Sequence, residues 1–167
     1  MLTRHMKDTK ISFIFDVEDK RWHRYIPDLL PFAARICRHL QAVLPSSKAL
    51  GEINVLFSNA RNVKKLNYQF RHKNKSTNVL SFPAPIGSGG DIILSFEDVL
   101  KETQMQQKKI NAHTAHLLVH GSLHLLDYTH DHPAAAREME NLETFILSFS
   151  NIPDPWRKAN TKSSHGV

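Results

Sequence analysis

Cysteine is nearly absent from this chain of 167 residues, which contains only Cys37. A single cysteine excludes an internal disulfide, and its place in a segment with helical spacing predicts a buried thiol. Long apolar runs are also missing, so no membrane-spanning segment is expected. Residues 1–10 carry charges of both signs and no apolar stretch, which is unlike a signal peptide. A cytoplasmic location is therefore expected.

Acidic residues are missing from the window between Glu52 and Asp91. Basic residues in this window account for the formal net charge of +6, so the remainder of the chain is balanced. A solvated helix face is the commoner explanation of a charge run, but charges of a single sign favour a polyanion partner bound through phosphate contacts. The candidate RNA-binding residues are Arg61, Lys64, Lys65, Arg71, Lys73 and Lys75.

Aromatic residues are interleaved with these basic residues. Tyr68 or His72 is suited to stack on a base, because every base offers a flat face to an aromatic ring. Phe70 is instead predicted to lie in the core.

Histidine is abundant, with 11 in the chain. His120 and His124 are four residues apart, so on a helix both rings project from one face. His130 follows beyond the expected end of that helix. A histidine pair at this spacing is often only packing, but the third histidine favours a metal site. Three imidazoles leave the fourth position of a tetrahedral zinc open, which is typical of catalytic rather than structural zinc.

Three further histidines are weaker candidates. His113 and His116 share the helical stripe of His120, but ligands spread over so many turns would be too far apart for one ion. His132 could in principle exchange with His130.

Gly121 occupies the position after the first histidine of the pair. Zinc proteases of the His-Glu-x-x-His type carry their general base at this position, so peptide hydrolysis by that mechanism is disfavoured. The missing side chain is expected to leave room beside the metal for a bulky substrate.

The stretch His-Gly-Ser-Leu-His-Leu-Leu-Asp-Tyr-Thr-His, which ends at His130, closely resembles the signature of the YbeY family of endoribonucleases, approximately His-Gly-x-Leu-His-Leu-x-Gly-Tyr-Asp-His. The segment from Arg71 to Pro83 is similar to the family's Arg-Gly-x-x-x-x-Thr-Asp/Asn-Val-Leu-Ser-Phe-Pro. Gly90-Asp91-Ile92 and the Met139–Glu143 helix also agree. The resemblance covers roughly residues 52–149.

The chain departs from the family pattern at four positions. Asp127 and His72 each stand where the family has Gly, Thr129 stands where it has Asp, and Ser76 stands where Pro is common. The loss of Asp before the last histidine removes a carboxylate that could orient a metal ligand. Asp127 or Asp131 is a candidate to replace it.

The resemblance implies a metal-dependent endoribonuclease that cleaves single-stranded RNA. It implies a role in ribosomal RNA maturation, at the 3′ end of 16S ribosomal RNA, and in ribosome quality control. The expected partners are single-stranded RNA, ribosomal RNA and ribosomal subunits. One zinc per chain would be held by His120, His124 and His130, which together with Arg71 form the expected catalytic set.

Two other functions remain open. One is a metallohydrolase of another substrate. The other is a non-catalytic RNA-binding ribosome-assembly factor with a structural zinc, which would need Asp127 or Asp131 as a fourth ligand.

The periodicity predicts one α+β domain over residues 1–150 and a polar, fraying tail over 151–167. A small mixed sheet of about four strands is expected to pack with about five helices. The metal site is expected on a central helix and the loop that follows it. Expected strands span 11–17, 52–58, 79–82 and 91–95, and expected helices span about 31–44, 60–70, 96–110, 111–126 and the segment from Pro133 to about 149.

Overall fold

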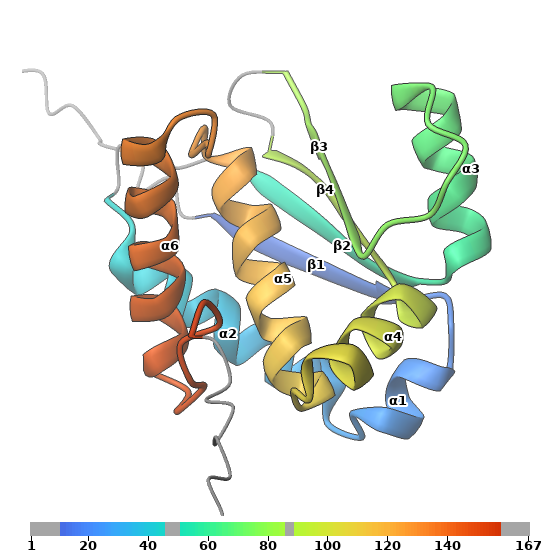
Figure 1. Cartoon of the computed structure of the whole chain (residues 1–167), viewed down its shortest axis with the longest axis horizontal. Coiled ribbons are helices and arrows are strands. Elements are labelled where there is room, and N and C mark those ends of the chain that lie inside the picture. The colour runs from blue at the N-terminus through green and yellow to red at the C-terminus, as the bar shows by residue number, and fades with distance from the viewer. Residues whose placement is uncertain (1–10, 46–50, 86–88, 158–167) are drawn as a thin grey trace, which may run out of the picture.

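The computed structural model describes residues 11–45, 51–85 and 89–157, and these form four strands and six helices (Figure 1). The expectations for residues 1–10 and for the tail beyond residue 157 lie outside the described residues. The elements are β1 (Ser12–Val17), α1 (Arg21–Tyr25), α2 (Leu29–Val43), β2 (Glu52–Ser58), α3 (Ala60–Arg71), β3 (Val79–Pro83), β4 (Gly89–Ser95), α4 (Phe96–Gln106), α5 (Ile110–Leu125) and α6 (Pro133–Ser148).

The four strands form one sheet in the order β1-β2-β4-β3. β1, β2 and β4 run parallel, and β3 is antiparallel to β4. Parallel neighbours need crossover connections, which α2 and α3 provide. The predicted α+β fold with a small mixed sheet is therefore confirmed, with one more helix than expected because α1 is separate from α2.

The two faces of the sheet are covered differently, as alternation along β2 shows. Ile53, Val55 and Phe57 are buried in the main core, on the face covered by α2, α5 and α6 (Figure 1). On the other face α3 packs through a smaller cluster that includes Val63 and Leu80. The α5 helix lies between the sheet and α6, so 11 of its 16 residues are buried.

Two helix boundaries differ from the prediction. The α2 helix begins at Leu29 rather than near Pro31. Proline is tolerated there because the first N–H groups of a helix have no partner within it. The α4 helix ends at Gln106, since Gln107 adopts a left-handed conformation with φ 53°.

Several side-chain expectations are also settled. Cys37 is buried, as predicted, and burial raises the pKa of its thiol. Phe70 is 59% exposed and packs against Phe82, so its prediction as a core residue was wrong. Phe149, which follows the last residue of α6, is also exposed. No helix within the described ranges has the length and apolar character needed to cross a bilayer.

Candidate metal centre

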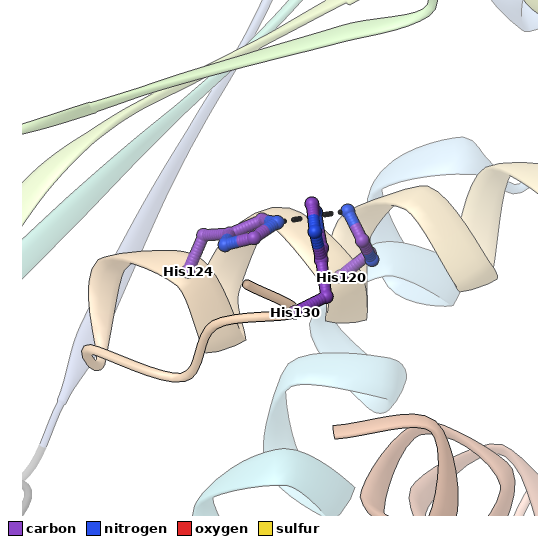
Figure 2. Close-up of side chains that lie close together, drawn as sticks. All are labelled: His120, His124 and His130. Atoms are coloured by element: carbon purple, nitrogen blue, oxygen red, sulfur yellow. Dashed lines mark hydrogen bonds between the residues drawn. The ribbon is translucent and has the colours of Figure 1, made fainter. Parts of the chain in front are cut away.

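The α5 helix and the turn after it bring His120, His124 and His130 together (Figure 2). One ring nitrogen of each lies within 4.8 Å of those of the others. The rings of His120 and His130 are nearly parallel, with centroids 6.0 Å apart, and that of His124 is almost perpendicular to both. The three predicted metal ligands therefore form one cluster.

A tight turn after α5 returns His130 to the helix. The N–H of Tyr128 donates to the carbonyl of Leu123 at 3.1 Å, and the N–H of Asp127 donates to the carbonyl of His124 at 3.2 Å. This pair of bonds is the Schellman pattern, which requires a left-handed residue that is usually glycine. Asp127 takes that conformation with φ 63°.

The outer nitrogens of the two helical histidines are held by oxygen acceptors. The Nδ1 of His120 lies 2.6 Å from Oε1 of Glu143, and the Nδ1 of His124 lies 3.1 Å from the carbonyl of Tyr128. Because these oxygens only accept, the neutral rings carry their protons on Nδ1. Both Nε2 atoms then present lone pairs to the centre of the cluster.

The spacing of these lone pairs fits a metal ion. The Nε2 atoms of His120 and His124 are 3.0 Å apart (Figure 2). Two nitrogens on a tetrahedral zinc are separated by about 3.3 Å, given bonds of about 2.0–2.1 Å. Two facing lone pairs repel each other, and a cation between them removes the repulsion. The donor set and its protonation therefore fit a bound metal ion.

Burial lowers the pKa of His124, and the neighbouring His120 and His130 lower it further. These effects outweigh the opposite influence of the Tyr128 carbonyl and of Glu143. A metal ligand must be a neutral imidazole, so the environment favours the form that binds.

Glu143 is the carboxylate that orients the cluster. It is fully buried on α6 and accepts hydrogen bonds from His116 at 2.8 Å, from His120 and from Nε1 of Trp156 at 2.9 Å. Burial alone would raise its pKa, but the bonds from His116 and His120 hold that pKa at about 2. The carboxylate thus stays ionised and fixes the tautomer and the orientation of His120.

Sequence reasoning assigned this orienting role to the wrong residues. Asp127 and Asp131 are exposed, and neither belongs to a group of potential metal ligands among the described residues. The sequence did contain an indication of this role. Glu143 is spaced four residues from the apolar Met139 and Leu147, so it lies with them on the buried face of α6. A charged residue at such a position is rarely buried without a partner.

Glu143 could also hold an ion together with His116 and His120. In that group each contact already joins a nitrogen donor to a carboxylate oxygen, and the Trp156 indole, which cannot bind a metal, occupies the same carboxylate. The hydrogen-bonded interpretation therefore explains this second group completely.

The candidate histidines His113 and His132 have structural partners. His113 is buried against Glu102, with 2.6 Å between Nε2 and Oε2. His132 caps α6, because its Nδ1 accepts from the N–H of Ala135 at 3.3 Å. Their exclusion as ligands is consistent with these contacts.

Gly121 faces the sheet rather than the metal cluster. A Cβ at this position would meet Oγ of Ser81 at 3.0 Å and Cγ2 of Ile92 at 3.3 Å. The expectation that Gly121 leaves room for substrate was therefore wrong. The glycine instead allows α5 to approach β3 and β4 closely, and Oγ of Ser81 donates to the Gly121 carbonyl at 3.3 Å.

Arg71 lies at the end of α3 and joins the same cleft as the histidines. The cleft has a volume of about 1320 Å³, and its lining includes Arg71, His120, His124 and His130. One Nη2 N–H of Arg71 donates to the carbonyl of Ser81 at 2.9 Å, and the guanidinium lies over the ring of Phe82. This hydrogen bond leaves most N–H groups of the planar guanidinium available for an anion.

The other basic residues of the acid-free window do not line this cleft. They are exposed on α3 and on the chain that follows it. These residues are Arg61, Lys64, Lys65, Lys73 and Lys75. The structure thus separates Arg71 from the rest of the window.

Comparison with known proteins identifies the family. The family model described as Endoribonuclease YbeY matches residues 14–151. The chain belongs to the YbeY family. A curated Endoribonuclease YbeY from Gluconobacter oxydans is 41% identical over 156 residues, which are 90% of this chain and 91% of that protein. Relatives of the same name from Nitrosococcus oceani and Bartonella quintana are each 37% identical, and they cover 88% and 97% of their own lengths and 76% and 87% of this chain.

Family membership confirms the resemblance that the histidine signature carries, and with it an endoribonuclease of the YbeY type.

Two departures from the family pattern have one structural feature in common. Asp127 and His72, with φ of 63° and 56°, replace Gly at left-handed positions that end α5 and α3. Aspartate and histidine are among the residues best tolerated in that conformation, so the backbone is preserved.

Proposed function

We propose that this protein is a zinc-dependent endoribonuclease that cleaves single-stranded RNA. The observation that carries the proposal is the cleft that joins three convergent histidines to an anchored arginine. His120, His124 and His130 would hold one zinc ion. When bound, zinc supplies Lewis acidity toward a phosphoryl oxygen and lowers the pKa of water.

Arg71 is proposed to contact the phosphate that is attacked. Its planar fork suits two-pronged contact with phosphate oxygens, and the Ser81 carbonyl fixes its orientation before the substrate arrives. Charge that grows on the phosphate in the transition state is then met by donors already in position. Glu143 keeps the ring of His120 aligned.

Ribosomal RNA is the proposed substrate, and ribosomal subunits are the proposed partners, with maturation of the 3′ end of 16S ribosomal RNA as the role. The support is the family to which the chain belongs. The exposed basic residues of α3 and of the chain that follows it fit non-specific contact with an RNA backbone. A structural zinc in a non-catalytic assembly factor is less well supported, because Asp127 and Asp131 do not join the ligand cluster within the described ranges.

The experiment is cleavage of a single-stranded RNA that carries the 16S 3′-terminal region. Zinc-loaded wild-type protein is compared with Arg71→Lys and His120→Ala, purified identically to control for contaminating nuclease. Arg71→Lys keeps the charge but loses the fork, so we expect cleavage to slow by about 10²-fold or more while zinc content stays unchanged. Equal cleavage by all three proteins would contradict the proposal.

A further inference from the structure

The segment that follows α6 forms one wall of the cleft. Pro153 to Arg157 line the same cavity as the three histidines. Trp156 is the aromatic residue of this wall, and 46% of its surface is exposed, whereas Trp22 is fully buried in the core. An exposed indole in a cleft with Arg71 and the metal ligands is a surface on which a base can stack.

The wall is held by contacts at several points. Nζ of Lys108 donates to the carbonyl of Pro155 at 2.9 Å. Oδ1 of Asp154 accepts from the hydroxyl of Thr144 at 3.1 Å and from the N–H of Trp156 at 2.9 Å. These bonds fix the backbone of Trp156 before any ligand binds, so little conformational entropy would be lost on binding.

The indole is also fixed relative to the metal cluster. Its Nε1 donates to Oε2 of Glu143, whose Oε1 accepts from His120. One carboxylate group therefore separates the indole from a candidate metal ligand. The edge-to-face contact with His116, at 5.3 Å between ring centroids, supports the same orientation.

We propose that Trp156 stacks on a base of the single-stranded RNA, on the nucleotide beside the cleaved bond. The inference rests on the proposed function, which supplies the RNA. Stacking accepts any base, so Trp156 sets the position of the strand in the cleft and adds affinity without reading sequence. This role also explains why an exposed indole in the wall of the cleft is held so firmly.

Two substitutions separate stacking from a purely structural role. Trp156→Phe and Trp156→Leu both remove the N–H that Glu143 accepts, but only Phe keeps an aromatic face. If Trp156 stacks on a base, Trp156→Leu should weaken binding of a hexauridylate by about tenfold or more, and it should raise KM more than it lowers kcat. Trp156→Phe should retain most of the affinity. Equal losses in both variants, accompanied by equal loss of zinc, would overturn the proposal.

Fluorescence tests the contact directly, since the chain has two tryptophans and Trp22 is inaccessible. Hexauridylate should quench wild-type emission to saturation and leave the residual emission of Trp156→Phe unchanged. The reading is taken before cleavage begins, and a gel of the same sample shows that the oligonucleotide is still intact. Binding without quenching overturns the proposal. Quenching by a wild-type protein that never cleaves RNA supports stacking and refutes the nuclease, whereas cleavage without quenching refutes stacking alone.

Discussion

The histidine cluster (His120, His124 and His130) and the exposed basic residues of α3 and the chain after it differ in how their side chains are held. Each helical histidine of the metal cluster has its outer nitrogen fixed by Glu143 or by the Tyr128 carbonyl. The exposed basic residues of α3 and of the chain that follows it have no ion-pair partner among the described residues. These residues are Arg61, Lys64, Lys65, Lys73 and Lys75. The first region is a preorganised site, whereas the second is a charged surface whose side chains are not fixed. Single substitutions should therefore be severe in the first and mild in the second.

The largest effect is expected for His124→Ala, which removes one of three ligands and leaves too few to retain zinc. Metal analysis of the purified variant should show that most of the zinc is lost, and RNA cleavage should fall to background. His132→Ala is the matched control, because His132 only caps α6 and its loss should cost about 1 kcal/mol of stability without loss of metal. Unchanged zinc content in His124→Ala would remove this residue from the site.

Glu143→Gln is the next test, since it keeps the shape of the side chain and removes its charge. Gln cannot accept from His116, His120 and Trp156 as an ionised carboxylate does. We expect zinc affinity to fall by about 10–100-fold, the usual cost of losing a partner of a metal ligand. Competition with a chromogenic chelator measures this affinity. The exposed Glu138→Gln on the same helix should bind zinc normally, and equal affinities for the two variants would show that Glu143 does not orient His120.

A smaller effect is expected on the basic face. If these residues contact only phosphates, as proposed, the double variant Lys64→Ala/Lys65→Ala should weaken RNA binding similarly for unrelated sequences. The slope of log affinity against log salt should become shallower by about 1.4, or about 0.7 for each lost contact with a single strand. Zinc content and the maximal cleavage rate should not change. A slope identical to that of the wild type would exclude phosphate contacts by this pair.

Asp127→Gly should have the smallest effect. Relief of left-handed strain gains about 1–2 kcal/mol, and the more flexible unfolded chain offsets about 0.4–1 kcal/mol of it. We expect the free energy of unfolding to rise by about 0.5–1 kcal/mol in urea titrations. Asp131→Gly, a loop residue without positive φ, is the control and should not stabilise the protein. A destabilised Asp127→Gly would mean that the carboxylate has a contribution of its own.

Residues whose roles depend on local spacing were predictable from the sequence. The i, i+4 spacing placed His120 and His124 on one helix face, and alternation located β1. Roles that depend on contacts between distant segments were not. Glu143 lies 23 residues from His120 and reaches it only because α6 packs on α5. Trp156 was assigned to a polar tail for the same reason, since composition does not show which buried group a side chain will meet.

Gly121 has a consequence for how the cleft can be tuned. Ser81 accepts from Arg71 through its carbonyl and donates to the Gly121 carbonyl through its hydroxyl, so this one residue of β3 links Arg71 to the helix that carries His120 and His124. Any side chain at position 121 acts as a spacer between these two halves of the catalytic apparatus. A graded series of Ala, Ser and Val would widen the gap between α5 and β3 in steps, because the added atoms would press on Ser81 and Ile92. The absence of a side chain at position 121 thus sets how closely the helix that carries His120 and His124 approaches the strand that anchors Arg71.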